Sequence, residues 1–323
     1  MKVQLICEKV IKHLDGFTLS NIDFTAEPGE ITGIIGVNGS GKTTLIRTLL
    51  GAYRLWESDS GRIRMESVNR SGEEKEDGSH VRISELDGED SSKRYKDKIA
   101  YVLTRTPYPI NMICIEVGEI YGRYYSGFDL ELYREKLSDF SLKENQRIGA
   151  LSTGERMRQQ IAFALASGAD VYLFDEPAGN LDVDFREKFN NLLRQLAYDE
   201  NKTVLYATHI VEELECMADR ILWLDKESGE KGKKGIQKFF GTIDELRDSY
   251  RIVEAPASEL EQIPEEMLVG KRMTNLHSEA LVNAGEWEIT DGLSANIRLA
   301  GLQEIMYYSC SDMQTYGVQK TKF

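Results

Sequence analysis

The sequence lacks a long apolar run and has few cysteines. No stretch approaches the roughly 20 apolar residues that cross a bilayer, and the first residues, MKVQLICEKV, do not have the layout of a signal peptide. The cysteines lie far apart, without the close paired spacing of a zinc site or a redox motif: Cys7, Cys114, Cys216 and Cys310. We therefore expect buried free thiols in a reducing cytoplasm, and any membrane span to come from another chain.

The sequence also lacks a surplus of basic residues. It has 40 Lys and Arg against 54 Asp and Glu, which gives a formal net charge of −14. An acidic chain disfavours a broad nucleic-acid surface or an anionic membrane face, so we expect no nucleic-acid partner. The 323 residues are 41% hydrophobic and 29% charged, which is typical of a globular protein. This length favours one sizeable α/β domain with a smaller second part.

A glycine-rich segment, GVNGSGKTT, follows the strand-like ITGIIG and precedes the helical KTTLIRTLL. The spacing of its glycines, lysine and threonine is that of a P-loop, in which small residues let backbone N–H groups converge on phosphates. We expect Lys42 to reach the β- and γ-phosphates of a nucleotide and Thr43 to bind Mg²⁺. The residues of this loop predicted to bind the nucleotide are Gly36, Asn38, Gly39, Ser40, Gly41, Lys42, Thr43 and Thr44.

Polar side chains follow two short apolar strands. Asp175 and Glu176 end VYLFDE, and His209 comes after TVLYAT. Parallel strands bring their carboxyl ends to one edge of a sheet, where ligands bind. We expect Asp175 to hold Mg²⁺ through water, Glu176 to polarise an attacking water, and His209 to contact the γ-phosphate and that water. The predicted catalytic set is Glu176, His209 and Lys42. A solvated turn is the less favoured interpretation of the adjacent Asp175 and Glu176.

A second helix start lies at LSTGERMRQQ, residues 151–160, where Ser152 and Gly154 precede an apolar helical run. Exposed amides at a helix start favour an anion. One chain of this length has little room for two nucleotides, so this second site requires another explanation.

These motifs, in this order, resemble those of ABC-type ATPases over roughly Val3 to Leu246. The resemblance implies an ATP-hydrolysing subunit that uses ATP and Mg²⁺ and pairs head to tail with a second ABC ATPase subunit, in a homodimer or a heterodimer. Ser152 and Gly154 would then close over the partner's ATP, and Asp182 in GNLD would belong to the D-loop between the sites. It also implies a separately encoded transmembrane permease and a location on the inner face of the cell membrane.

The resemblance implies an α/β fold of the P-loop NTPase type, with a parallel core sheet, an antiparallel β subdomain and a helical subdomain. We predict an ATPase domain over residues 1–246, with the helical subdomain at 105–150 and a polar surface insertion at 66–98. Residues 251–323 are predicted to form a small α+β accessory domain. The segment IRLAGLQEIMYYSC, residues 297–310, resembles the end of ATPase subunits of ABC-2-type bacterial exporters, which favours export over import.

The sequence departs from the family pattern at three positions. Thr153 and Glu155 replace the commoner glycine and glutamine of the signature, and Thr104 stands where the family has a coupling glutamine that touches Mg²⁺. Because of Thr104, a module that uses ATP only as a clamp is one alternative; the other is a soluble ABC ATPase that is not coupled to transport.

Aromatic residues leave two further questions open. In this family an aromatic side chain stacks on adenine, and KHLDGF offers Phe17 or His13; Phe17 is the predicted contact, although FTLSNIDF also alternates like a half-buried strand. Several tyrosines could line a groove for a partner helix or pack within the helical subdomain: Tyr108, Tyr121, Tyr124 and Tyr125.

Overall fold

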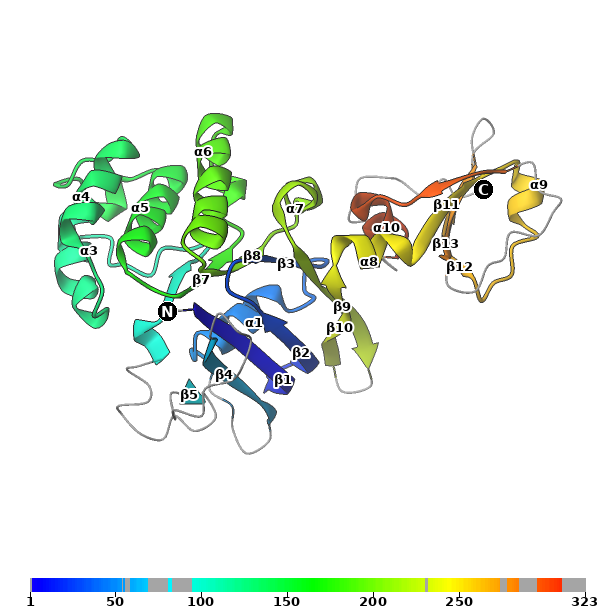
Figure 1. Ribbon diagram of the computed structural model, residues 1–323, viewed down its shortest axis with the longest axis horizontal. Helices are drawn as coiled ribbons and strands as arrows, with labels where there is room; N and C mark the ends of the chain where they lie inside the picture. The colour runs from blue at the N-terminus through cyan, green and yellow to red at the C-terminus, as the bar shows by residue number, and fades with distance from the viewer. Residues whose placement is uncertain are drawn as a thin grey trace. The chain divides into compact units, whose positions relative to one another are not determined.

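The protein is described from a computed structural model, which covers residues 2–53, 55, 59–68, 81–82, 95–229, 232–273, 278–284 and 295–309 (Figure 1). The chain divides into two compact units. The first comprises Met1–His209 and Leu222–Lys238, and the second comprises Ile210–Ile221 and Phe239–Phe323. Within the described residues, no helix combines the length and the apolar character that a membrane span requires.

The first unit is built on a ten-stranded sheet with the order β5-β4-β1-β2-β10-β9-β3-β8-β7-β6. Its core strands pair in parallel: β3 (Ile31–Ile35), β8 (Thr203–Ala207), β7 (Val171–Asp175) and β6 (Ile99–Val102). Every residue of β3, β7 and β8 is buried, as expected for strands covered on both faces. The predicted parallel core is therefore confirmed.

The sheet continues into an antiparallel part, as predicted. Its strands are β1 (Lys2–Leu14), β2 (Phe17–Ala26), β4 (Ser60–Val68) and β5 (Val81–Arg82). The strand β10 (Gly232–Thr242) runs parallel to β2, and β9 (Arg220–Gly229) lies between β10 and β3. This order places the start of β2 beside the edge of the core from which the P-loop leaves.

Helices of the first unit form two groups. The helix α1 (Lys42–Leu49) follows β3, and α6 (Val183–Arg194) is extended by a π-helical turn over Gln195–Asp199. The helices α3 (Cys114–Tyr121), α4 (Leu130–Asp139) and α5 (Thr153–Ala166) pack together, as Figure 1 shows. The Phe163 ring lies at the centre of an aromatic cluster in this helical group, with Tyr108, Tyr125, Phe128 and Tyr133.

The predicted polar insertion at 66–98 falls largely outside the described residues. Its described ends belong to the folded core rather than to a surface loop. The strand β4 runs to Val68, and Glu66 is buried. Tyr95 is also buried, and its hydroxyl donates to the Leu49 carbonyl. The insertion boundaries of 66 and 98 are therefore too wide at both ends.

The second unit contains the predicted α+β part of the chain. Its four-stranded antiparallel sheet has the order β12-β13-β11-β14. The strands are β11 (Tyr250–Glu254), β12 (Leu268–Arg272), β13 (Glu279–Asn283) and β14 (Asn296–Leu299). The helices are α7 (Val211–Met217), α8 (Ile243–Asp248), α9 (Ala257–Leu260) and α10 (Leu302–Ser309).

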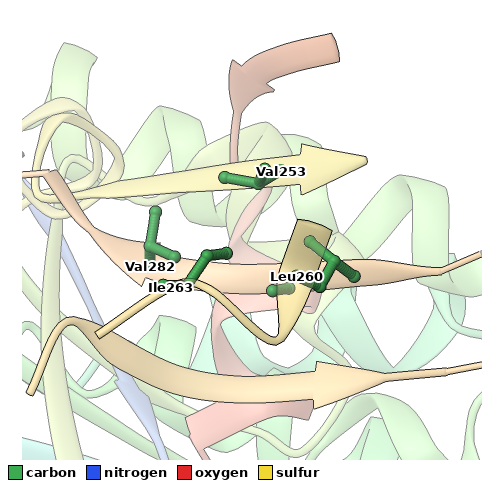
Figure 2. Close-up of a cluster of buried hydrophobic side chains, with 5 residues drawn as sticks. Val253, Leu260, Ile263 and Val282 are labelled. Carbon is green, nitrogen blue, oxygen red and sulfur yellow. The ribbon is translucent and has the colours of Figure 1, made fainter. Parts of the chain in front are cut away.

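Short helices of the same unit pack against this sheet. On one face, Leu260 of α9 and Ile263 after it pack with Val253 and Val282 of the strands, as Figure 2 shows, and Ala280 belongs to the same cluster. The helix α10 contacts β12, β13, α7 and α8. Because α7 belongs to this unit, the unit begins earlier in the chain than residue 251. The accessory domain over residues 251–323 stays a prediction.

The cysteines correspond in part to the expectation of buried thiols. Cys7 and Cys114 are free and buried, whereas Cys216 is exposed. Cys216 lies on α7, a short helix with one face covered, so the prediction was wrong for this residue. Cys310 lies outside the described residues.

Candidate functional site

The P-loop connects β3 to α1 with backbone geometry that needs glycine. Gly41, the residue before α1, has φ 103°, in the left-handed region. A Cβ on Gly36 would lie 2.2 Å from the Leu224 carbonyl oxygen, so no side chain fits there. No side chain caps the start of α1, and its first turn has no acidic residue. The first amides of this helix are therefore available to an anion.

A pocket of about 570 Å³ opens over this loop. It brings together the P-loop, the loop after β7 and His209 in the loop after β8. The residues that line it are Phe17, Val37, Asn38, Gly39, Gly41, Lys42, Thr43, Thr44, Thr104, Glu176, Gly179, Asn180 and His209. Val37, Gly179 and Asn180 had not been predicted as site residues; the GNLD sequence around Asn180 was the available signal.

Two polar side chains of the loop, Lys42 and Ser40, are buried, and Lys42 lines the pocket. Lys42 is 7% exposed, and its Nζ donates to the Gly36 carbonyl at 2.7 Å. Burial lowers the pKa of Lys42, while Glu176 and Asp175 act to raise it. The Ser40 hydroxyl is buried and has no hydrogen-bond partner among the described residues. An anion in the pocket would be a stronger partner for the Lys42 ammonium than the Gly36 carbonyl, whereas Ser40 does not line the pocket.

Glu176 lies between a cation and the histidine. Its Oε1 is 3.8 Å from Lys42 Nζ, its Oε2 accepts from the His209 backbone N–H at 3.3 Å, and Oε2 is also hydrogen-bonded to His209 Nδ1. Its φ of 53° is in the left-handed region, which costs a non-glycine residue about 1–3 kcal/mol and is typical of functional sites. The fold therefore holds this carboxylate in one place at a cost in backbone energy.

Asp175 is held by hydroxyl groups. The Thr43 hydroxyl donates to its Oδ1 at 3.2 Å. The Thr104 hydroxyl lies 3.2 Å from its backbone carbonyl oxygen and 3.5 Å from its Oδ2. Burial raises the pKa of Asp175, and the Thr43 hydrogen bond opposes that shift.

This donor set fits Mg²⁺ bound together with a nucleotide. Within the described ranges, no cluster of three or more His, Cys, Asp or Glu side chains could hold a metal ion by itself. Mg²⁺ usually takes one or two carboxylates and completes its shell with phosphate oxygens and water. The Asp175 carboxylate and the Thr43 hydroxyl supply such a partial shell beside the phosphate loop.

The two candidates for an adenine contact separate clearly. Phe17 lines the pocket, and its Cζ is 2.9 Å from the position that a Cβ on Gly41 would take. His13 does not line the pocket, and its Nδ1 is 3.1 Å from the Thr18 hydroxyl. The geometry therefore favours Phe17.

The start of α5 satisfies part of its own backbone. The Ser152 hydroxyl accepts from the Glu155 N–H at 3.2 Å, and Glu155 Oε2 accepts from the Ser152 N–H at 2.8 Å. Neither Ser152 nor Gly154 lines the pocket of its own chain. A Cβ on Gly154 would lie 2.7 Å from the Asn180 carbonyl oxygen, so the signature segment lies against the loop after β7.

Asp182 begins α6 and does not line the pocket. Its Oδ1 accepts from the Phe185 N–H at 2.9 Å, and Oδ2 pairs with Arg158 of α5. These contacts hold the start of α6 against α5. A nucleotide contact of Asp182 stays a prediction.

A second, apolar groove of about 410 Å³ lies beside the helical group. All four tyrosines for which two roles were open line it, together with the segment after α1 and residues of β6 and α5. Tyr108 is buried against Tyr121 and Phe163, whereas Tyr124 is 74% exposed. The tyrosines thus both pack the helical group and line a groove.

Comparisons with known proteins agree with the fold and the motifs. A family model described as ABC transporter matches residues 19–179. The ABC transporter ATP-binding protein NatA of Bacillus subtilis (strain 168) is 30% identical over 233 residues, which cover 69% of this chain and 81% of that protein. The zinc uptake ATP-binding protein ZnuC of the same organism is 27% identical, over 66% of this chain and 86% of that protein.

Two further comparisons extend this similarity. The Nod factor export ATP-binding protein I of Rhizobium leguminosarum bv. viciae is 30% identical, over 67% of this chain and 64% of that protein. A dimeric ATP-binding cassette in a post-hydrolysis state with ADP and Pi has a TM-score of 0.58 at 22% identity, over 74% of this chain and 98% of that one, which supports the fold. The chain therefore belongs to the ATP-binding, ATP-hydrolysing subunits of ABC transporters.

Proposed function

We propose that the pocket binds ATP and Mg²⁺ and that Glu176 polarises the water that attacks the γ-phosphate. The observation that carries this proposal is the position of the Glu176 carboxylate between Lys42 and His209 at the pocket. Among the described residues, Glu176 supplies the one carboxylate that lines the pocket. A carboxylate held in place can accept a proton from water as the water attacks.

The other residues prepare that step. A γ-phosphate is a stronger partner for the Lys42 ammonium than the Gly36 carbonyl, so phosphate binding draws Lys42 away from Glu176 and leaves the carboxylate to the water. His209 holds the carboxylate through its backbone N–H and its ring, and contacts the γ-phosphate and the same water. Thr43 and Asp175 would hold Mg²⁺, which neutralises phosphate charge when bound.

Phe17→Ala tests the nucleotide site. Stacking of a base on an aromatic ring contributes about 1–3 kcal/mol by alanine substitution, so ATP affinity should fall roughly tenfold or more. The measurement is equilibrium binding of a ribose-labelled fluorescent ATP. His13→Ala is the control and should bind ATP like the unaltered chain. Normal binding by Phe17→Ala with weakened binding by His13→Ala would assign the stack to His13.

The partners of the chain are part of the proposal. A second ABC ATPase subunit completes each ATP site through Ser152 and Gly154, and a separately encoded permease places the chain at the inner face of the cell membrane. The apolar groove beside the helical group supports the permease contact, because it offers aromatic surface with one strongly exposed ring, Tyr124. Its occupant in this proposal is an apolar helix of the permease.

Tyr124→Asp tests this contact. A carboxylate in the groove would have to be desolvated on docking, so recovery of the permease with the tagged chain from detergent-solubilised native membranes should fall at least tenfold. Tyr124→Phe keeps the apolar ring and should recover as much permease as the unaltered chain. Equal recovery by Tyr124→Asp would exclude this groove. If no multispanning protein is recovered with any variant or with the unaltered chain, that result would favour the soluble ATPase alternative.

The direction of transport is the finer part of the proposal. We propose export, on the resemblance of residues 297–310 to the ends of ABC-2-type exporter subunits. The relatives include one protein named for zinc uptake and one named for export, so the comparisons do not decide the direction. The test measures in which direction membranes that contain the complex move the cargo. Export is the expected result, and uptake would contradict it.

A further inference from the structure

Thr104 and Gln160 connect α5 to the site proposed for Mg²⁺. We call α5 the signature helix, because Ser152 and Gly154 lie at its start. Both carboxylate oxygens of Asp175 have a hydroxyl neighbour: Thr43 at 3.2 Å from Oδ1 and Thr104 at 3.5 Å from Oδ2. The Thr104 hydroxyl is also 3.2 Å from the Asp175 carbonyl oxygen. Since Thr43 belongs to the P-loop and Thr104 follows β6, two separate segments hold Asp175. Thr43 binds its carboxylate, and Thr104 binds its backbone carbonyl and lies beside Oδ2.

Gln160 holds the segment that carries Thr104. It is 2% exposed on α5, its Nε2 donates to the Leu103 carbonyl at 3.1 Å, and its Oε1 accepts from the Leu103 N–H at 3.1 Å. One buried amide thus takes both backbone groups of the residue before Thr104. This paired contact fixes the position and the orientation of the loop after β6 relative to α5.

The helix α5 makes this contact relevant to the proposed partner site. Its first residues carry Ser152 and Gly154, and Gln160 lies about 12 Å further along the same rigid helix. Movement of α5 when a partner's ATP engages its start would be transmitted through Gln160 to Leu103 and Thr104. Thr104 in turn touches Asp175 and lines the nucleotide pocket.

We propose that Thr104 is a positioning residue for the Asp175 carboxylate, and that Gln160 couples this position to α5. The pair would link α5 to the cation site of the same chain by hydrogen bonds. The inference rests on the proposed function, because it assumes that nucleotide and Mg²⁺ bind together in the pocket.

The first test compares Thr104→Val with Thr104→Ser. Valine has nearly the same shape but no hydroxyl, so it loses the hydrogen bond to the Asp175 carbonyl and the contact with Oδ2. Such a hydrogen bond has a net effect of about 1.5 kcal/mol at most, which corresponds to roughly tenfold in affinity. The measurement is the affinity for fluorescent ADP with and without Mg²⁺. The Mg²⁺-dependent gain is the factor by which Mg²⁺ increases the affinity for ADP. In Thr104→Val this gain should be about tenfold smaller, while the affinity without Mg²⁺ stays the same. Thr104→Ser should behave like the unaltered chain.

Three results would overturn the role of Thr104. These are an unchanged Mg²⁺-dependent gain in Thr104→Val, an equal loss of affinity with and without Mg²⁺, and failure of Thr104→Ser to restore the gain. A different result, no nucleotide binding by the unaltered chain, would instead contradict the proposed function. The two failures are therefore distinguishable.

The second test is a double-mutant cycle with Gln160→Met. Methionine fills a similar volume without the two hydrogen bonds to Leu103. If Gln160 acts through Thr104, the loss of Mg²⁺-dependent gain in the double variant should be smaller than the product of the single losses. Independent losses would overturn the coupling. If Gln160→Met does not fold, Gln160→Glu, which keeps the acceptor for the Leu103 N–H, takes its place in the cycle.

Discussion

Glu176→Gln is expected to reduce ATP turnover roughly 10²- to 10⁴-fold, the usual contribution of a general base. The amide has the shape of the carboxylate but cannot accept the proton of the attacking water. ATP binding should persist or become tighter, because the variant removes a negative charge 3.8 Å from Lys42 Nζ. The measurements are phosphate release and equilibrium binding of ATP.

A second observation strengthens this test. With turnover blocked, chains bound to ATP should accumulate as closed dimers on size exclusion, whereas the unaltered chain should return to its nucleotide-free state. Glu187→Gln, an exposed carboxylate on α6, is the matched control and should hydrolyse ATP normally. Near-normal phosphate release by Glu176→Gln would remove Glu176 from its catalytic role.

Thr153→Asp should abolish hydrolysis while it leaves the isolated chain intact. Thr153 is exposed and is the first residue of α5. A carboxylate in the first turn is favourable to a helix by about 0.3–1 kcal/mol, so the melting temperature should stay the same or rise. In the proposed dimer the same carboxylate would face the partner's γ-phosphate, and repulsion would prevent closure.

The position of this substitution matters. Replacing Gly154 would disturb the chain itself, because a Cβ there would meet the Asn180 carbonyl oxygen at 2.7 Å. Thr153→Asn has the size of aspartate without the charge and should retain much of the activity. Normal hydrolysis by Thr153→Asp, or a loss equal to that of Thr153→Asn, would show that no phosphate approaches this helix start.

The sequence was sufficient where chemistry and local geometry depend on adjacent residues. The P-loop needs glycines at fixed intervals between a strand and a helix, and all of these lie within residues 31–49. The polar residues after β7 and β8 could be assigned to one edge because parallel strands end on the same side. Phe17 was the predicted adenine contact, but the sequence also offered His13, and only the contacts of the β1-β2 hairpin with the P-loop separate the two.

Contacts between distant segments were not predictable. Thr104 and Asp175 are far apart in the sequence, and only the pairing of β6 with β7 brings them together. Gln160 reads as one more polar residue of a helix until its contact with Leu103 is known. The left-handed backbone of Glu176 also has no sequence signal, because it is imposed by the hydrogen bonds that surround the residue.

The grouping of elements into units was also beyond the sequence pattern. The helix α7 follows His209 directly, yet its contacts with α10 place it in the second unit. Leu302 donates its backbone N–H to Glu215 of α7 at 2.7 Å, and Gln303 donates to Glu212 at 2.7 Å. Such contacts join segments that composition treats as unrelated.

The most direct test of the two-subunit site mixes Thr153→Asp chains with Lys42→Ala chains. Each variant alone should be inactive, the first through its signature helix and the second through its P-loop. In a head-to-tail mixed dimer, one site contains both lesions and the other contains neither, so phosphate release should reappear in the mixture. A mixture that forms mixed dimers on size exclusion and still releases no phosphate would contradict a site shared between two subunits.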